Sequence, residues 1–145
     1  MILFNSAINT TQRILIDNYL SSKYNLSLSS NDKFLFDGTY SFDVTGIGQE
    51  TSLDNHTDSR GRGIVRVNSA SDLEDGEYML WGHDNGGTST TLLEVPGAYA
   101  STSGEKLVQE WQVDISGGDN SVGTVTLTFN LPPGSNFGSS DDTYN

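Results

Sequence analysis

The feature that most constrains the fold of this chain is a strict alternation of apolar and polar residues in the stretch VGTVTLTFNL, residues 122–131. The apolar residues occupy every second position: Val125, Leu127, Phe129 and Leu131. The positions between them are polar: Thr124, Thr126, Thr128 and Asn130. Successive side chains of a β-strand point to opposite faces of a sheet, so this pattern predicts a half-buried antiparallel strand.

Other short runs rich in β-branched and aromatic residues recur along the chain. The predicted strands cover residues 1–4, 33–36, 41–46, 63–67, 77–83, 107–115 and 122–131. The spacers are rich in Gly, Asn and Asp, which supply the positive φ angles of tight turns. Short strands separated in this way predict a mainly β chain with an antiparallel β-sandwich. The polar segments 49–63 and 86–105 are expected to be long loops.

One segment, residues 9–25, shows helical rather than strand periodicity. Asn9 or Thr10 can cap its first turn, Lys23 suits the negative end of the helix dipole, and Asn25 can adopt the left-handed conformation that ends a helix. The apolar residues recur at three- and four-residue spacing: Leu15, Ile16, Tyr19, Leu20 and Tyr24. We expect this stripe to pack on the sandwich. Leu20→Ala should then cost about 2–5 kcal/mol, as for a core leucine.

Composition narrows the partners more than it defines a function. The 145 residues suffice for one domain with a real core. A net charge of −12 disfavours nucleic acid and anionic membranes as partners. There is no cysteine, which excludes disulfides, thiolate metal sites and a cysteine nucleophile. No run approaches the ~18 apolar residues of a membrane span, and the N-terminus lacks the basic and apolar regions of a signal peptide.

The N-terminal stretch ILFNSAINTTQRILIDNYLSSKYNLSL resembles the end of a concanavalin-like (LamG-type) domain in large bacterial surface proteins. In that family a closing strand leads into a helix with the pattern Q/E-R-x-x-I-x-x-Y-L-x-x-K-Y. The residues at the patterned positions here are Gln12, Arg13, Ile16, Tyr19, Leu20, Lys23 and Tyr24. The resemblance therefore implies that residues 1–28 are the terminal strand and helix of a preceding lectin-like domain, or a linker from it.

The rest of the chain resembles the β-rich domain that follows the lectin-like domain in those proteins. The matching stretches are DVTGIG (43–48), GIVRV (63–67), DGEYMLWGHDNG (75–86), EWQV (110–113) and VGTVTLTFNL (122–131). The sequence departs from the family before Trp111, where an Arg is common. Family members also continue into another strand and an acidic loop, so the resemblance implies a sandwich module over residues 29–145 that is truncated at its C-terminus.

This resemblance implies an extracellular or cell-surface setting in a multidomain bacterial protein. The expected function is non-enzymatic, either adhesion or structural spacing, with neighbouring domains of the same polypeptide as partners. A carbohydrate-binding module, assisted by calcium or not, is the alternative, with glycans as partners. A fragment of a secreted hydrolase is the second alternative.

The stretch EYMLWGHDNGG, residues 77–87, is the first candidate site. One interpretation is a central strand buried on both faces that ends in a turn, in which Asp84 and Asn85 bond to their own backbone. The other is a sugar platform, in which an exposed Trp81 stacks on a ring while the turn residues bond to hydroxyls. The candidate ligand-binding residues are Trp81, His83, Asp84, Asn85 and Trp111.

The segment 54–58, DNHTD, is the second candidate site. Oxygen ligands at alternate positions suit calcium, and Asp54, Asn55 and Asp58 could supply them. The segment lacks the turn glycine and the terminal bidentate glutamate of a complete calcium loop. A solvated loop is therefore the competing interpretation.

No catalytic motif emerges from the sequence. The chain has two histidines, His56 and His83, and lacks the motifs of serine hydrolases, zinc proteases and phosphate-binding loops. Zinc held by these histidines and an aspartate is conceivable on ligand chemistry. We predict that the chain has no catalytic residues and needs no cofactor, with calcium as the leading candidate ion.

Overall fold

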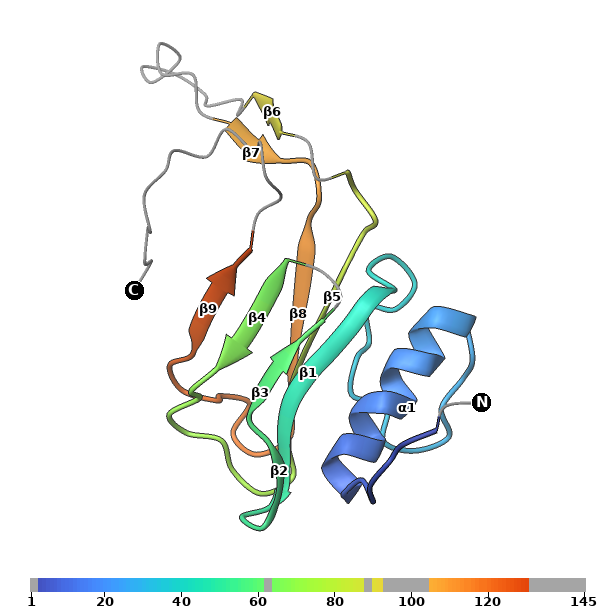
Figure 1. The fold of residues 1–145 in the computed structure, drawn as a ribbon, viewed down its shortest axis with the longest axis vertical. Helices are drawn as coiled ribbons and strands as arrows, with labels where there is room; N and C mark the ends of the chain where they lie inside the picture. The colour runs from blue at the N-terminus through green and yellow to red at the C-terminus, as the bar shows by residue number, and fades with distance from the viewer. Residues whose placement is uncertain (1–2, 62–63, 88–89, 93–104, 131–145) are drawn as a thin grey trace.

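The computed structural model describes residues 3–61, 64–87, 90–92 and 105–130, which form one helix and nine strands (Figure 1). Helix α1 is Thr10–Tyr24. The first five strands are β1 (Phe42–Thr51), β2 (Asp54–His56), β3 (Asp58–Arg60), β4 (Val65–Asn68) and β5 (Glu77–His83). They are followed by β6 (Thr90–Leu92), β7 (Glu105–Leu107), β8 (Trp111–Ser116) and β9 (Thr126–Phe129).

Two antiparallel sheets form the sandwich. The first has the order β2-β1-β5-β8 and the second has the order β3-β4-β9, while β6 and β7 form a separate pair. Strand β5 lies between β1 and β8, and each of its seven residues is buried. The fold predicted from the strand pattern is therefore confirmed: the chain is a mainly β antiparallel sandwich with one N-terminal helix packed on it.

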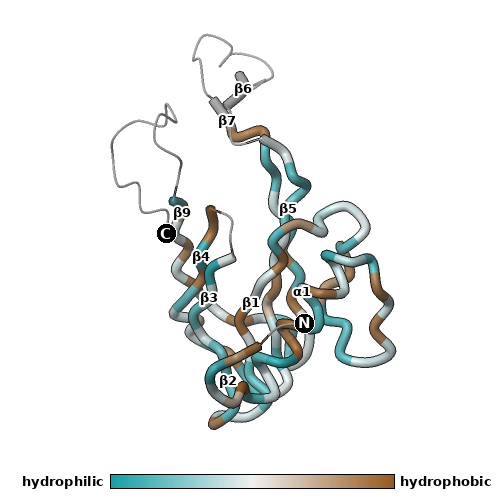
Figure 2. Tube along the Cα trace, turned by 45° about the vertical axis from the view of Figure 1, so that its right-hand side comes forward, coloured by the Kyte–Doolittle hydropathy of each residue, from teal (hydrophilic) through white to brown (hydrophobic). Residues whose placement is uncertain are grey.

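The chain buries two apolar layers. Between the sheets, Ile47, Met79 and Trp81 of the first sheet meet Val65 and Val67 of the second. On the outer face of the first sheet, α1 covers a second cluster: Ile14, Leu15, Phe34, Val44, Tyr78 and Leu80. In Figure 2 the apolar (brown) stretches of β1 and β5 lie in the middle of the molecule beside α1. Because β5 supplies both layers, it has no polar face.

The predicted limits of the helix are confirmed. The Asn9 side chain accepts the Gln12 amide at 2.7 Å, and the Gln12 side chain accepts the Asn9 amide at 3.1 Å, so the helix begins with a capping box. It ends at Asn25, which adopts the left-handed conformation with φ 51°. Among the described residues, no helix is long and apolar enough to cross a membrane.

The predicted docking face of the helix is correct at Leu15 and wrong for most of the stripe. The buried residues of α1 are Thr11, Ile14, Leu15, Asn18, Ser21 and Ser22, of which four are polar. Of the predicted stripe, Leu15 is buried, Leu20 is half-buried and Tyr24 is 61% exposed. The polar residues can be buried because they are hydrogen-bonded, as Asn18 is to the carbonyls of Ile14 and Asn31 and to the Lys33 amide.

The segment 33–36 was predicted as a strand and is instead an irregular connection that leads into a turn. Its backbone amides are satisfied by side chains: Lys33 donates to Asn18 at 2.7 Å and Leu35 donates to Asp114 at 2.8 Å. Phe34 is 1% exposed and inserts beneath the helix. This single buried anchor replaces the ladder of a strand.

Part of the predicted loop 49–63 is strand. Strand β1 continues to Thr51, and β2 folds back beside it with Gly48 opposite His56. The loop prediction failed because β2 and β3 are short and polar, and they are held by their neighbours rather than by an apolar face of their own. In the segment 86–105, β6 adds a strand at Thr90–Leu92, while residues 88–89 and 93–104 lie outside the described residues.

Several other predicted strand limits also differ. Leu3 and Phe4 are in no strand, while residues 1–2 lie outside the described residues. The run 107–115 is not one strand: it begins at the last residue of β7 and includes all of β8 except Ser116. Strand β9 covers Thr126–Phe129 and pairs antiparallel with β4, as expected. The half-buried face predicted for this strand is not observed: all four residues of β9 are exposed, Leu127 by 49% and Phe129 by 50%.

Candidate functional site

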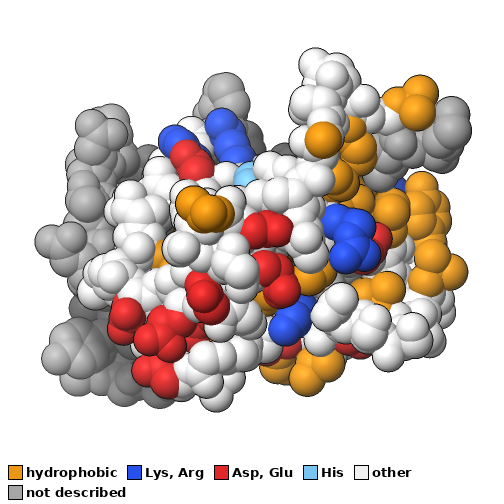
Figure 3. Space-filling model, turned by 90° about the horizontal axis from the view of Figure 1, so that it is seen from below, with side chains coloured by type: hydrophobic (Ala, Val, Ile, Leu, Met, Phe, Trp, Pro, Cys, Tyr) orange, Lys and Arg blue, Asp and Glu red, His pale blue; other side chains and the backbone are white. Residues whose placement is uncertain are grey.

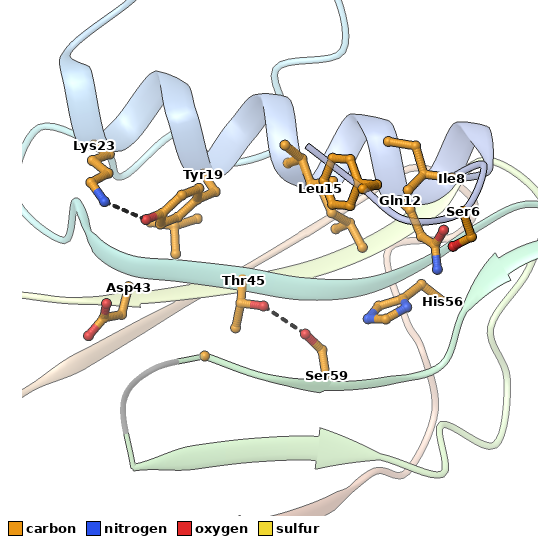
Figure 4. Close-up of a pocket in the computed structure, with 14 residues that line it drawn as sticks. Ser6, Ile8, Gln12, Leu15, Tyr19, Lys23, Asp43, Thr45, His56 and Ser59 are labelled. Atoms are coloured by element: carbon orange, nitrogen blue, oxygen red, sulfur yellow. Dashed lines mark hydrogen bonds between the residues drawn. The ribbon is translucent and has the colours of Figure 1, made fainter. Parts of the chain in front are cut away.

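A groove of about 580 Å³ lies between α1 and the strands β1 to β3 (Figure 4). Gln12, Ile16 and Tyr19 line it from the helix. Thr45, His56 and Ser59 line it from the strands. The size and the mixture of apolar surface with a few polar groups are typical of ligand sites in proteins, so this groove is the leading candidate site.

One hydrogen bond between side chains closes the strand wall of the groove. Thr45 and Ser59 join their hydroxyls at 2.7 Å. In the antiparallel pair β1–β2, Gly48 lies opposite His56. Thr45 is three residues before Gly48 and Ser59 is three residues after His56, so the same register places these two residues opposite each other. The chain of β2 and β3 thus continues alongside β1 while passing from the first sheet to the second.

His56 lies at the end of the groove near the helix N-terminus. Its side chain is half-buried, and burial lowers the pKa of its imidazole below the ordinary 6.5, against a weaker opposing effect of Asp58. The imidazole is therefore neutral at pH 7 and offers one donor and one acceptor.

Lys23 and Asp43 lie at the other end of the groove. The Lys23 ammonium donates to the Tyr19 hydroxyl at 2.6 Å and lies 5.1 Å from the centre of the Tyr19 ring. Asp43 has φ 50°, unusual for a non-glycine residue within a strand, where the β1–β5 register shifts between Phe42 and Thr45. Its carboxylate reaches His83 at 3.0 Å.

Trp81, the centre of the predicted sugar platform, is 3% exposed. It packs between the sheets against residues such as Ile47 and Val67. Trp81 therefore offers no ring face to a ligand, because the second sheet packs on the face of β5 that carries it. The interpretation as a buried strand followed by a turn describes this stretch.

His83 and Trp111 do come together, as directly paired residues of β5 and β8. Their ring centres are 6.4 Å apart, and further contacts extend the row to Phe42 on one side and Phe129 on the other. His83 is 7% exposed, whereas Phe42 and Phe129 are 45% and 50% exposed. The row thus begins and ends at the surface and has a buried imidazole within it.

Asp84 and Asn85 form the turn after β5. The Asp84 carboxylate accepts the amides of Glu110 at 3.1 Å and Gly86 at 2.8 Å, and these bonds lower the pKa of Asp84. Asn85 has φ 62°, and its amide donates to the His83 ring at 3.0 Å. The side chain of Asp84 thus serves the turn itself. Ligand binding by His83, Asp84, Asn85 and Trp111 stays a prediction.

The predicted calcium residues have other partners. The two oxygens of Asp54 accept the amides of Thr10 and Thr11 at 3.1 and 2.9 Å. Asp58 of β3 and Arg66 of the neighbouring strand β4 form a two-pronged salt bridge between their side chains. Asn55 donates to the Ser52 carbonyl at 3.0 Å. Calcium binding stays a prediction, which thermal unfolding with calcium and with a chelator can check.

Within residues 3–61, 64–87, 90–92 and 105–130, no three or more His, Asp or Glu side chains lie close enough together to hold a metal ion. Acidic side chains predominate over basic ones on the face seen in Figure 3. Several of them lie side by side at the lower left of this view.

The groove residues were missed at the sequence level. Ile16 and Tyr19 were assigned to the docking stripe, and Thr45 and Ser59 were assigned no role. One signal was available in the sequence. Polar residues lie between the apolar residues of the stripe, and they could form a second helix face that is buried. Nothing in the sequence indicates that Ser59 meets Thr45, because that contact depends on how β2 and β3 cross between the sheets.

The comparison with protein families matches residues 12–144 to a family described as a domain of unknown function, DUF8202. The chain belongs to the DUF8202 family. The DUF8202 match includes most of α1 as well as the sandwich, so the helix and the strand walls of the groove both lie within it. Neither the curated proteins nor the solved structures contain a significant match to this DUF8202 chain.

Proposed function

We propose that this chain is a non-enzymatic module of an extracellular or cell-surface protein, which serves adhesion or structural spacing within a multidomain polypeptide. The supporting observation is the bonded junction between the helix and the sandwich. A spacer must transmit orientation from one end to the other, which requires that its elements do not move independently.

The junction is formed at the N-terminus of α1. Asp54 of β2 accepts two amides of the first helical turn, where a negative charge also suits the helix dipole. The Thr11 hydroxyl donates to the Asp54 carbonyl at 2.7 Å and accepts the Glu50 amide at 3.1 Å. The Asn9 side chain donates to the Asn55 carbonyl at 3.0 Å.

Pulsed electron spin resonance tests whether this junction is rigid. The chain has no cysteine, so Arg13→Cys on the helix and Thr128→Cys on β9 give a single pair of labels. A rigid module gives one narrow distance distribution, which broadens when Asp54→Ala is added. A broad distribution in the parent pair, with the sandwich still folded, would contradict the spacer role.

Enzymatic activity is tested separately, by incubating the pure protein with glycan and peptide substrates. We expect no turnover. Turnover that disappears when a groove residue such as His56 is replaced would instead support the hydrolase-fragment alternative and overturn the non-enzymatic proposal.

The second candidate function, carbohydrate binding, is favoured by a different observation. The groove beside α1 combines an aromatic residue, aliphatic surface and neutral hydrogen-bonding groups, which suits ligands with both apolar and hydroxyl-bearing faces. This candidate no longer depends on Trp81, which is buried.

A further inference from the structure

We propose that the groove between α1 and β1–β3 binds a short, neutral oligosaccharide, with Tyr19 as the principal contact. This inference deepens the second candidate function and moves its site from the Trp81 turn to the helix. It does not depend on the structural role of the helix junction.

The shape of the groove sets the length of the ligand. The lining residues Gln12, Ile16, Tyr19 and Lys23 follow one side of α1. Lys23 is eleven positions after Gln12 in the helix, which corresponds to roughly 16 Å along the axis. Figure 4 shows this row above β1, with Thr45, Ser59 and His56 below it. An elongated ligand of a few sugar units suits such a groove better than a single compact molecule.

The polarity of the groove sets the chemistry of the ligand. The half-buried Ile8 and Ile16 supply aliphatic surface, while Leu15 and Val44 line the groove as buried residues. Neutral groups that both donate and accept hydrogen bonds lie beside it, on Thr45, Ser59 and the His56 imidazole. A sugar ring presents the matching combination of an apolar face and hydroxyl edges, and an aromatic side chain such as Tyr19 suits the apolar face.

Charge argues against an anionic ligand. Lys23 is the one Lys or Arg among the described lining residues, and its ammonium already donates to the Tyr19 hydroxyl at 2.6 Å. Asp43 contributes a carboxylate at the same end. The net charge of −12 adds a general repulsion of anions. Phosphorylated ligands and uronic acids are therefore disfavoured.

The strand wall argues against an extended peptide. Peptides that add to a sheet need a strand edge with unpaired backbone groups. Beside the groove, β3 runs along β1, and the Thr45–Ser59 bond at 2.7 Å joins them. A peptide strand that paired with β1 there would have to displace β3 and break this side-chain contact, which disfavours an extended peptide.

Nuclear magnetic resonance titration of the whole chain tests the proposal, with cellotriose, mannotriose and chitotriose as probes at millimolar concentration. Trigalacturonic acid and an uncharged extended peptide of similar length serve as comparisons. We expect amide shifts at Gln12, Tyr19, Thr45 and Ser59 with at least one neutral sugar and none with the comparisons. No shifts with any neutral sugar, or shifts centred on Trp111, would overturn the assignment, as would equal binding of the acid or the peptide.

Two tyrosines on the same helix give a matched pair of variants. Tyr19→Ala should weaken sugar binding about fivefold to tenfold, as expected for the loss of an aromatic contact. Tyr24→Ala should change it less than about twofold, because Tyr24 is 61% exposed and is not among the lining residues. Equal losses would contradict the site.

Thermal unfolding of both tyrosine variants separates a lost contact from a lost fold. If Tyr19→Ala does not fold, Ile16→Trp, which fills the groove without removing the tyrosine, provides the same test: undiminished sugar binding by Ile16→Trp would overturn the proposal. The label-distance experiment on the helix junction is unaffected by either result, so failure of the sugar site and failure of the spacer role are distinguishable.

Discussion

The two long sides of helix α1 differ in the side chains they carry and in what those side chains contact. The side that docks on the sheet buries Asn18, Ser21 and Thr11, each of them hydrogen-bonded. The side that lines the groove carries Ile16 and Tyr19, both only half-buried. In this helix, the spacing of apolar residues alone does not mark the docking face, because hydrogen-bonded polar residues share that face with Ile14 and Leu15.

The docking side combines polar anchors with two apolar contacts. Ile14 is 1% exposed and Leu15 is 7% exposed. Both lie in the cluster with Val44, and Gly46 of β1 leaves room for the helix. A side chain added at Gly46 would start 2.7 Å from Leu80 Cγ and 3.1 Å from Leu15 Cδ2. On the docking side, the helix and β1 approach each other closely and few large residues lie between them. On the groove side, the larger residues stay accessible.

The largest expected effect breaks the docking side. Ile14→Ala should lower the free energy of unfolding by about 2–5 kcal/mol, because it removes a fully buried aliphatic side chain. Leu20→Ala, on the half-buried side, should cost less than about 1 kcal/mol. Urea unfolding measures both. Equal losses would show that the apolar stripe, rather than the polar face, carries the docking.

The polar anchors are tested at Asn18. Asn18→Ala should cost about 1–3 kcal/mol, because the Asn31 carbonyl and the Lys33 amide lose hydrogen bonds to a buried side chain in a partly buried setting. The neighbouring Asp17→Ala removes an exposed, 4.0 Å contact with Arg13 and should cost less than about 1 kcal/mol. A loss at Asn18 no larger than at Asp17 would mean that its hydrogen bonds contribute nothing to docking.

A smaller, pH-dependent effect is expected at the junction. The Thr11 backbone amide is the main cause that lowers the pKa of Asp54 below 3.8. The unfolded state therefore binds the proton first, and the stabilisation by Asp54 is present above 3.8 and is lost as the pH falls through the lower folded pKa. Asp54→Asn should destabilise the protein near neutral pH, and its difference from the parent should shrink in acid.

Chemical unfolding across this acidic range measures the difference, with the exposed Asp32→Asn as the control. A gap between parent and Asp54→Asn that stays constant down to the lowest pH would contradict the capping role of the charge, and would indicate a purely steric contact.

The smallest effect is expected on the groove side. Burial lowers the pKa of His56, so the unfolded state takes up a proton near pH 6.5 before the folded state does. Stability should therefore fall as the pH drops below 6.5, and His56→Gln should remove this step. The chemical shift of the imidazole C–H reports the folded pKa directly, and a midpoint at or above 6.5 would contradict the burial.

Much of the fold was predictable from local patterns. The stretch 77–83 reads as a strand and is one, and the capping residues Asn9 and Asn25 fix both ends of the helix. Strands β2 and β3 were not predictable, because three polar residues carry no periodicity. The segment 33–36 misled because its side chains favour a strand, whereas its amides bond to Asn18 and Asp114 from distant parts of the chain.

The candidate site was the least predictable part. Trp81 and His83 attract attention in a sequence because large aromatic and ionisable side chains can bind ligands, but β5 acquires neighbours on both sides and buries them. Asp54 and Asp58 satisfy the spacing of calcium ligands, but the helix amides and Arg66 occupy their oxygens. The partners of Asp54 come from a segment more than 40 residues away in sequence, whereas the partner of Asp58 lies on the next strand, β4.

The sequence by itself determined the antiparallel sandwich, the helix limits and the acidic surface, because alternation, capping and net charge are properties of neighbouring residues or of simple sums. Only the tertiary structure decided which side of α1 is buried and where a groove remains. Those outcomes depend on hydrogen bonds such as Asn18 with Lys33 and Thr45 with Ser59, whose partners are brought together only when the sheets and the helix have packed.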